Sequence, residues 1–307
     1  MMTFKSLPPI VTSVHGNENH DETIVFIHGW PDDEHLWDLQ VGRLSRDYKC
    51  LTFTLPWFGD SETAKLNASK FNYSPWGYSF EDIADMLYAS IVQHCESKVI
   101  VVGHDWGAVY AEYLQARHPE IVSKMIILDV GGFKINSPVS LLHIPWYGLQ
   151  GLAYQYSLIV AFLTGGITGK FIASMYSWIA KQEVLIRAQH RYRSFYAKKH
   201  ATILPESGYP YYYHHKDFLM QLFGFKRAPT SNVRCPTLFI HGGNKLIPFH
   251  DVTWGNSLNE YEDSGITSVP CGHWLPIERA DDTTSCIESY LKTPEIFLRK
   301  IKLQSKI

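Results

Sequence analysis

The segment VIVVGHDWGA, residues 99–108, constrains the fold more than any other part of this chain. Its first residues are β-branched and apolar and indicate a buried strand, and the small residues from Ala108 onward indicate a helix. A strand that passes into a helix almost without a loop needs a very sharp turn, and Gly103 and Gly107 lack the Cβ atoms that would obstruct it. The residue at the tip of the turn, Asp105, is then forced out over the edge of the sheet.

The rest of the chain alternates between predicted strands and predicted helices. Short apolar, β-branched runs predict strands at residues 24–28, 50–55, 98–102, 124–128, 236–240 and 266–269. Apolar residues at helical spacing predict helices over residues 34–46, 79–95, 108–117, 251–258 and 281–291. Ser79 is placed to cap the second of these helices, and residues 298–307 are expected to form a loosely held tail. The alternation predicts a doubly wound, mostly parallel α/β sheet, whose ligands bind beyond the carboxyl ends of the strands.

The alternation stops after residue 128 and resumes at residue 236, so the sheet contains an insertion. Its first part, from Ile135 to Gly169, holds no Asp, Glu, Lys or Arg and is long enough to span a bilayer. Prolines and glycines divide this stretch into pieces too short for an ordinary spanning helix. We therefore expect an apolar cap over an apolar pocket, and no stable insertion into a membrane.

Composition limits the partners of such a pocket. The chain is 45% hydrophobic and unusually aromatic, with 18 Tyr, 16 Phe and 9 Trp, which suits a small apolar substrate. Lys and Arg total 28 against 30 Asp and Glu, so no general attraction to nucleic acid or to an anionic membrane is expected. The five cysteines are scattered without a CxxC pair, which suits a reducing compartment. The first residues lack the apolar run of a secretory signal and the Arg-rich pattern of a transit peptide, so we expect a cytoplasmic protein.

A carboxylate at the tip of the turn indicates nucleophilic chemistry. Asp105 can attack an electrophilic sp³ carbon and form an alkyl–enzyme ester, which water then cleaves at the acyl carbon. The backbone N–H of Trp106, at the start of the helix, would stabilise the oxyanion of that second step. A second donor is expected from HGWP, residues 28–31, because its proline biases Trp30 away from helix and lets the Trp30 N–H point into the site. His28 is expected to support the loop structurally through a hydrogen bond.

The base is expected from CGHW, residues 271–274, just after the last short strand. His273 would activate the hydrolytic water, and a carboxylate at the end of another strand would hold its tautomer and stabilise the imidazolium. Metal sites are not expected, because His214 and His215 are adjacent and point apart, with no third ligand spaced with them. Since there is also no dinucleotide fingerprint, the expected chemistry needs no cofactor.

Together, HGWPDD, GHDWGA and GHWLPIERA resemble, in this order, the motifs of the α/β-hydrolase superfamily, specifically those of its epoxide hydrolase and haloalkane dehalogenase branches. The resemblance covers nearly the whole chain. It implies an α/β-hydrolase core over residues 1–132 and 231–307, interrupted by a helical cap domain over residues 133–230. It also implies a cofactor-independent hydrolase with an aspartate nucleophile.

The acid of the catalytic triad departs from the family pattern. In epoxide hydrolases it follows the strand that resumes after the cap, where this chain has HGGNKL, residues 241–246, with Asn244 in the expected place. An amide can orient an imidazole but cannot neutralise an imidazolium. Asp129, at the end of strand 124–128, occupies the alternative acid position of many haloalkane dehalogenases. An aspartate there is equally suited to cap the turn that follows it.

The two branches differ in how they treat the leaving group. Epoxide hydrolases protonate the leaving alkoxide with two cap tyrosines, for which the candidates here are Tyr154 and either Tyr212 or Tyr213. Haloalkane dehalogenases hold the halide with the Trp after the nucleophile and with an Asn in His-Gly-Asn-Pro. Trp106 satisfies the first requirement, but Trp30 replaces the Asn. The pattern thus favours opening of an apolar epoxide to a diol, with haloalkane dehalogenation, another hydrolase activity or a catalytically impaired ligand-binding protein as the alternatives.

Overall fold

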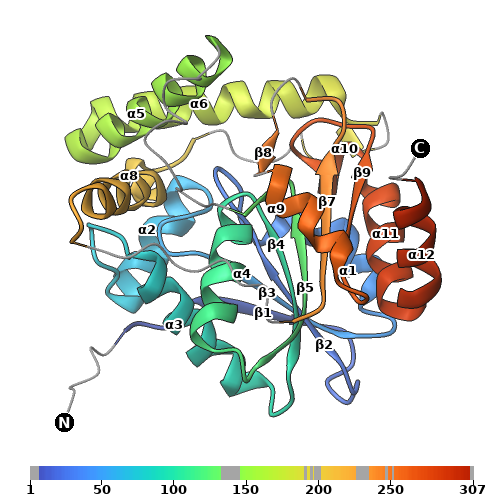
Figure 1. Ribbon diagram of the computed structural model, residues 1–307. Coiled ribbons are helices and arrows are strands. Elements are labelled where there is room, and N and C mark those ends of the chain that lie inside the picture. Colours follow the sequence, from blue (N-terminus) through green and yellow to red (C-terminus); the bar gives the residue numbers. More distant parts are fainter. Residues whose placement is uncertain are drawn as a thin grey trace.

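The computed structural model describes residues 7–132, 146–189, 192–193, 196, 202–225, 235–245, 248–250 and 252–304. In this described part the largest sheet has seven strands in the order β1-β3-β2-β4-β5-β7-β9 (Figure 1). Its strands are β1 (Val11–His15), β2 (Thr23–Ile27), β3 (Lys49–Thr54), β4 (Val99–His104), β5 (Val122–Leu128), β7 (Thr237–Gly242) and β9 (Gly265–Val269). β1 runs antiparallel to β3, and the other neighbouring strands are parallel. A small second sheet pairs β6 (Val130–Gly131) with β8 (Phe249–His250). The doubly wound, mostly parallel sheet predicted from the sequence is confirmed.

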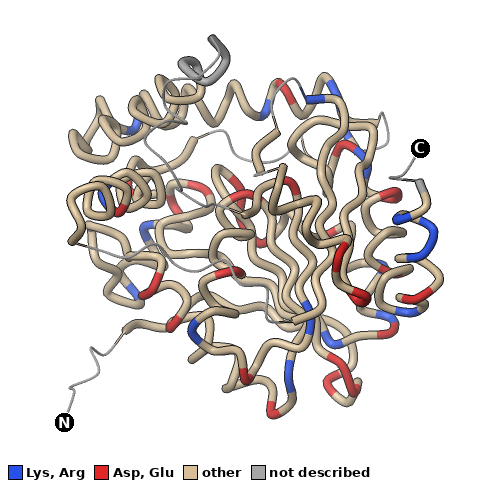
Figure 2. Tube along the Cα trace, viewed as in Figure 1, with Lys and Arg blue, Asp and Glu red and all other residues tan. Residues whose placement is uncertain are grey.

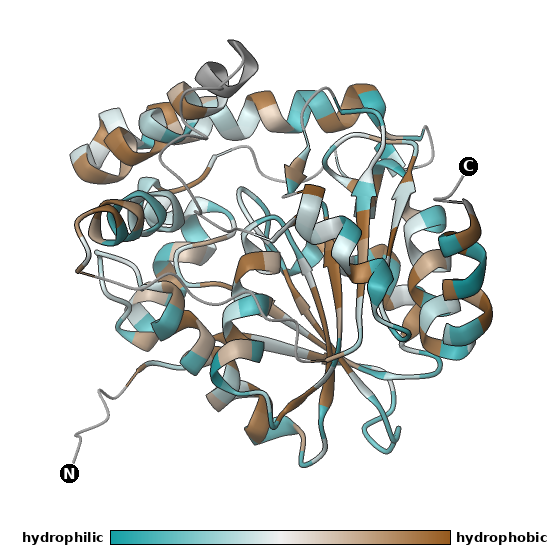
Figure 3. Ribbon diagram, viewed as in Figure 1, coloured by the Kyte–Doolittle hydropathy of each residue, from teal (hydrophilic) through white to brown (hydrophobic). Residues whose placement is uncertain are grey.

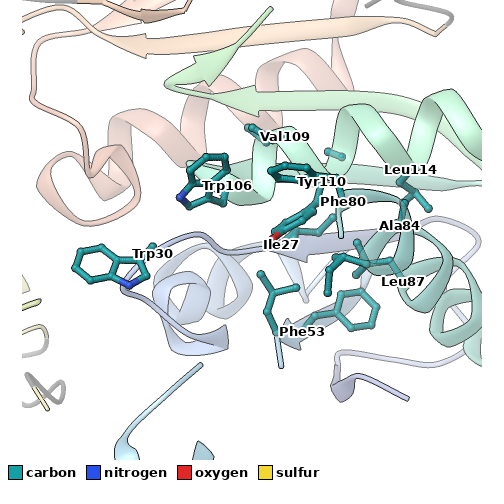
Figure 4. Close-up of a cluster of buried hydrophobic side chains, with 14 of the residues drawn as sticks. Ile27, Trp30, Phe53, Phe80, Ala84, Leu87, Trp106, Val109, Tyr110 and Leu114 are labelled. Carbon is teal, nitrogen blue, oxygen red and sulfur yellow. The ribbon is translucent and has the colours of Figure 1, made fainter. Parts of the chain in front are cut away.

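The central strands are buried on both faces, and helices therefore cover both sides of the sheet (Figures 1 and 3). Along β2, Ile27 contributes to one buried cluster and Phe26 to the other. The first cluster includes side chains of α3 (Phe80–His94) and α4 (Trp106–Arg117), and Figure 4 shows part of it, with Trp30 and Trp106 at one end. The second cluster includes side chains of α1 (Asp38–Leu44), α11 (Ala280–Lys292) and α12 (Pro294–Gln304). The helices of this core are η1 (Glu34–Trp37), α1 (Asp38–Leu44), α2 (Ser61–Phe71), α3 (Phe80–His94), α4 (Trp106–Arg117), α9 (Val252–Ser257), η4 (Leu258–Glu260), α10 (Leu275–Glu278), α11 (Ala280–Lys292) and α12 (Pro294–Gln304).

Helix ends follow from local sequence where a capping residue is present. Ser79 caps α3 as predicted. Its side chain accepts the Asp82 N–H, and the Asp82 side chain accepts the Ser79 N–H. Asp60 caps α2 in a similar way by accepting backbone N–H groups of the first turn. Neither α2 nor the edge strand β1 was predicted from the sequence.

The prediction of a loosely held tail at the C-terminus is wrong for the part of the tail that the structure describes. α12 continues to Gln304, and it packs against α11 and β9. Leu298 and Ile301, about one helical turn apart, are only 3% and 5% exposed. This apolar stripe joins α12 to the second buried cluster.

Between β6 and β7, the described residues form helices that lie over the carboxyl edge of the sheet (Figure 1). They are α5 (Trp146–Thr164), α6 (Gly166–Arg187), η3 (Pro205–Gly208) and α8 (Tyr209–Leu222). α5 packs against both α6 and α8. Of the expected cap, residues 133–145 and 226–230 lie outside the described residues, as do most of residues 190–201. Among the described helices, none combines the length and the apolar character that crossing a membrane requires.

The outward faces of these inserted helices are apolar. α5 carries no Lys, Arg, Asp or Glu, whereas charged residues are frequent around the lower part of the sheet (Figure 2). Exposed apolar side chains include Val160 and Leu163 on α5, and Ile167, Phe171 and Trp178 on α6. The insert is therefore apolar on its solvent side as well as toward the sheet.

Candidate active site

The turn between β4 and α4 places Asp105 at the carboxyl edge of the sheet, between these two elements. Asp105 has φ 55° and ψ −126°, in a region that side-chain-bearing residues rarely occupy. The neighbouring glycines are required by close backbone approach: a Cβ on Gly103 would lie 2.4 Å from the Gly107 carbonyl oxygen, and one on Gly107 would lie 2.0 Å from the Ile27 carbonyl oxygen. The sharp turn predicted from the sequence is confirmed.

Both oxygens of the Asp105 carboxylate have partners. Oδ1 accepts the backbone N–H of Trp30 at 2.8 Å, and Oδ2 lies 3.4 Å from Nε2 of His273. Gly29 makes room for this approach, since a Cβ there would lie 2.2 Å from Oδ1 and 2.6 Å from the backbone nitrogen of Trp106. Of the two predicted oxyanion donors, the N–H of Trp30 thus binds the Asp105 carboxyl group, and the backbone nitrogen of Trp106 lies close to Gly29 in the loop that carries Trp30.

His28 supports the loop that carries Trp30. Its imidazole is fully buried, with Nδ1 bonded to the Gly29 carbonyl at 2.9 Å and Nε2 accepting the Leu55 N–H at 3.0 Å. The prediction that His28 is structural is confirmed.

Asp129 and His273 meet, although they are far apart in sequence. Asp129 Oδ2 lies 2.5 Å from His273 Nδ1, and the Asp129 side chain has no exposed surface. Oδ1 of the same carboxylate accepts the Gly242 N–H at 2.9 Å and faces the Lys245 ammonium at 2.6 Å. The carboxylate of Asp129 is therefore directed at His273 and the β7 loop.

The environment separates the pKa values of this pair. Burial alone would raise the pKa of Asp129, but the hydrogen bond and charge of His273 and the charge of Lys245 hold it well below its usual range. Burial opposes the charge on His273, but hydrogen bonds to Asp105 and Asp129 outweigh it and raise the pKa of the imidazole to about 9. A pKa of about 9 favours the imidazolium form of His273 at neutral pH, next to the carboxyl groups of Asp105 and Asp129.

Asn244, in the place expected for the triad acid, is exposed. Its backbone N–H donates to the Cys271 carbonyl at 3.0 Å, and the carboxylate next to His273 comes from Asp129 instead. The sequence reasoning did not single out Lys245, which follows Asn244 and contacts Asp129.

Glu278 was also missed as a supporting residue, although it belongs to the GHWLPIERA motif. Its Oε2 accepts the N–H of Gly272 at 2.7 Å, and its Oε1 accepts the N–H of Trp274 at 3.1 Å. These are the residues on either side of His273, and the Glu278 side chain is buried. The available signal was the position of an acid one turn into a short helix, where it can reach back to preceding N–H groups.

Tyr154 on α5 and Tyr211 on α8 place their hydroxyl oxygens 2.5 Å apart. Both rings meet Trp30 edge to face, with centroid distances of 5.7 and 6.0 Å. Burial raises the pKa of both phenols well above the usual value, and the negative charge of Asp105 raises them further. Two neutral phenols therefore lie within electrostatic reach of Asp105.

The structure places Tyr211 in this pair, and not Tyr212 or Tyr213 as predicted. Tyr212 packs against Phe162 with a centroid distance of 5.4 Å, and Tyr213 has the Lys216 ammonium over its ring. Consecutive helical residues point about 100° apart, so only one of the three tyrosines can face Tyr154. Within the residues that the structure describes, no group of three or more His, Cys, Asp or Glu is arranged to hold a metal ion.

This sheet, with a carboxylate at a strand–helix turn and a histidine–aspartate pair beside it, is the arrangement of an α/β hydrolase. The chain matches the alpha/beta hydrolase family over residues 24–285, most of its length, and belongs to that family.

Comparison with known proteins places the chain near the epoxide hydrolases. Epoxide hydrolase 3 of Xenopus tropicalis is 22% identical over 298 residues, covering 91% of this chain and 74% of that protein. Epoxide hydrolase 4 of Homo sapiens is 24% identical over 116 residues, only 38% of this chain and 30% of its own length. The crystal structure of an epoxide hydrolase from Vigna radiata matches with a TM-score of 0.66 at 19% identity, covering 92% of this chain and 94% of that one. The chain is thus an epoxide hydrolase-like member of the family, and these relatives support a hydrolase.

Proposed function

We propose that this protein opens a small apolar epoxide to a diol through an ester of Asp105, without a metal or cofactor. In the first step Asp105 Oδ2 attacks an epoxide carbon, the C–O bond of the ring breaks, and the alkoxide takes a proton from Tyr154 or Tyr211. The other oxygen, Oδ1, stays with the Trp30 N–H.

In the second step, water attacks the carboxyl carbon of the Asp105 ester. His273 Nε2 takes the proton of the water, and the N–H groups of Trp30 and Trp106 stabilise the oxyanion. Collapse of the tetrahedral intermediate breaks the ester bond, and the departing alkoxide takes the proton from His273 to give the diol. The proton left on the Asp105 carboxyl group replaces the one that the tyrosine gave in the first step, which restores the free enzyme. Asp129 holds the imidazole through Nδ1 and stabilises its charge.

The single observation that carries the proposal is the hydroxyl pair of Tyr154 and Tyr211, whose rings pack against Trp30, the residue that donates its N–H to Asp105. A leaving alkoxide needs a proton donor, and neutral phenols in a buried site supply one, whereas a leaving halide needs only N–H donors. Trp30 in the place of the dehalogenase Asn further favours the epoxide. The names of the relatives support the same activity.

We also propose that residues 133–230 act as a cap domain on a core formed by residues 1–132 and 231–307. α5 and α8, which carry Tyr154 and Tyr211, lie over the carboxyl edge of the sheet (Figure 1), and both tyrosine rings contact Trp30 of the core. The cysteines at the described positions are unpaired thiols, which suits the reducing cytoplasm as the place of action.

Trapping of the ester tests the proposed function. His273→Gln is mixed separately with an aromatic epoxide and with a bromoalkane, and the intact protein is weighed by mass spectrometry. We expect a mass gain equal to the whole epoxide, which is absent in His273→Gln/Asp105→Ala. An adduct from the bromide alone would establish dehalogenase chemistry instead, and no adduct from either reagent would refute an Asp105 ester and favour a catalytically impaired ligand-binding protein.

A further inference from the structure

The loop after β7 brings a cation to the acid of the proposed triad. The Lys245 ammonium lies 2.6 Å from Asp129 Oδ1, and the two side chains are only 9% and 0% exposed. The other oxygen of Asp129 faces His273. One buried carboxylate is therefore shared between an imidazole and an ammonium.

The backbone fixes this loop against the segment that carries His273. The N–H groups of Gly243 and Asn244 donate to carbonyl oxygens at the end of β9 and just before His273, at 2.8 and 3.0 Å. The Lys245 ammonium also lies 4.4 Å from the centre of the Phe249 ring, which meets the His273 ring edge to face. The cation is thus held beside the triad and not extended into solvent.

The position of Lys245 matters because the charge of the site changes during the proposed reaction. In the free enzyme, the carboxylates of Asp105 and Asp129 balance the imidazolium of His273 and the ammonium of Lys245. Esterification moves one negative charge from Asp105 to the tyrosine that protonates the alkoxide, so that beside His273 one carboxylate then faces two cations. This imbalance favours transfer of the His273 proton to the tyrosinate, and the resulting neutral imidazole is the form that can accept a proton from water.

We propose that Lys245 is a positioning residue for the hydrolytic step: its ammonium holds Asp129 against His273 and keeps the imidazole free to act as a base once Asp105 is esterified. The inference rests on the proposed function and concerns its second half. Without this cation, Asp129 would stabilise the imidazolium alone, and His273 would retain its proton in the ester.

The other titratable groups around His273 do not carry a positive charge that could take the place of the Lys245 ammonium. Burial lowers the pKa of His104 to about 4 and lowers that of His241, so both rings are neutral at neutral pH. Burial also raises the pKa of Cys271 and of the two phenols above Asp105, which remain neutral. Glu278 is engaged by the two N–H groups beside His273. Arg187 and Arg279 add positive charge near Glu278 and Cys271, and this charge does not change during the reaction.

A titration without turnover tests the proposal. In Asp105→Asn the nucleophile is uncharged, as it is in the ester, and the titration of His273 is followed by NMR of its imidazole, assigned by its absence in His273→Gln. Adding Lys245→Met is expected to move this titration upward by about one pH unit. An unchanged or lowered titration would overturn the proposal.

Matched variants separate charge from structure. Lys245→Arg keeps the cation and should leave the titration of Asp105→Asn in place. Lys292→Met removes a lysine that pairs with Asp47 on the surface, and it should also leave the titration in place. Lys245→Gln serves as a second neutral variant if circular dichroism shows that Lys245→Met impairs folding.

Ester kinetics in the chain with native Asp105 supply a second readout. Lys245→Met should slow decay of the ester about tenfold at neutral pH and shift its pH profile upward, while ester formation keeps its rate. Equal slowing of both steps with an unshifted profile would indicate a merely structural role and overturn the proposal. Absence of an ester in every variant would refute the proposed function itself, whereas an ester with an unmoved His273 titration would refute only the role of Lys245.

Discussion

At Asp105, backbone conformation and side-chain contacts depend on each other. The strained φ aims the carboxylate over the sheet edge, and the bond from the Trp30 N–H holds one of its oxygens. Gly29 permits that bond because any Cβ there would overlap the carboxylate. The reactive geometry is thus set by neighbouring backbone, and the histidine and the tyrosines are added to it from other elements.

The hydroxyl pair of Tyr154 and Tyr211 predicts that, of the three adjacent tyrosines on α8, only Tyr211 is needed for activity. Tyr211→Phe should lower kcat/KM for an aromatic epoxide by about 10²-fold, because it removes a proton donor for the alkoxide. Tyr212→Phe, whose ring packs on Phe162, should remain close to the native chain. Steady-state kinetics of both variants checks this, and equal losses would remove Tyr211 from the acid role.

The ion pairs of His273 make stability depend on pH. Its pKa is raised from 6.5 to about 9 in the folded chain, so the stabilisation is fully present below pH 6.5 and is lost as pH rises through 9. Between about pH 6 and pH 10, the native chain should lose roughly 3 kcal/mol of unfolding free energy relative to His273→Gln. Urea unfolding at several pH values measures the difference, and a constant difference would contradict the ion pairing.

At the scale of elements, α10 stabilises the loop that carries His273 by hydrogen bonds that its last residue accepts. Glu278, at the end of this one-turn helix, binds the N–H groups of Gly272 and Trp274. The two N–H groups that flank His273 are therefore fixed by one buried carboxylate.

Loss of the two hydrogen bonds that Glu278 accepts should affect both the stability of the fold and turnover. Glu278→Ala leaves two buried N–H groups unpaired and should cost about 2–4 kcal/mol, with slower ester hydrolysis because His273 is less well placed. Glu278→Gln retains an acceptor and should cost less. Urea unfolding and the rate of ester decay measure the two effects. Native-like values for Glu278→Ala would show that the hydrogen bonds of Glu278 are not needed for either.

Elements with a strong pattern could be predicted from the sequence, and weak ones could not. β4 is continuously buried and begins with four apolar, β-branched residues, and α3 has both a capping residue and an apolar stripe. In α2, by contrast, the buried positions are small residues such as Ala64 and Ala68, which give little periodic signal. β1 lies at the edge and is only partly buried, so it lacks the apolar run of a central strand.

The same distinction holds in the site. Asp105 and His273 stand at strand ends within specific motifs, so their convergence follows from the parallel sheet. The contact of Lys245 with Asp129 joins positions 116 residues apart and depends on the path of a loop. The choice of Tyr211 depends on the rotation of α8 about its axis, which three consecutive tyrosines leave undetermined.

At the scale of the whole molecule, Asp32 joins three separate parts of the chain. Its carboxylate accepts the Tyr196 hydroxyl at 3.0 Å from the inserted region and the Trp274 indole N–H at 2.9 Å from the His273 loop. Asp32 itself follows Trp30 in the loop after β2 and is 4% exposed. The inserted region, the loop that carries Trp30 and the loop that carries His273 therefore meet at the buried carboxylate of Asp32.

Loss of one of these bonds should loosen the contact between the insert and the core. Asp32→Asn keeps one acceptor oxygen and should raise hydrogen exchange at the amides of α10 about tenfold, because local opening becomes easier. The amides of β4, in the centre of the sheet, should keep their protection and serve as the internal control. Unchanged exchange in α10 would show that the hydrogen bonds of Asp32 do not couple the inserted region to the loop that carries His273.

The bond between Trp30 and Asp105 makes the two carboxylate oxygens of Asp105 inequivalent. Oδ1 is held by the backbone, and Oδ2 is the atom that faces His273. Under the proposed mechanism, Oδ2 leaves with the product, and a solvent oxygen replaces it in the side chain. The new hydroxyl oxygen of each diol is thus an atom of the protein, and isotope supplied as labelled water reaches the product no earlier than the second turnover.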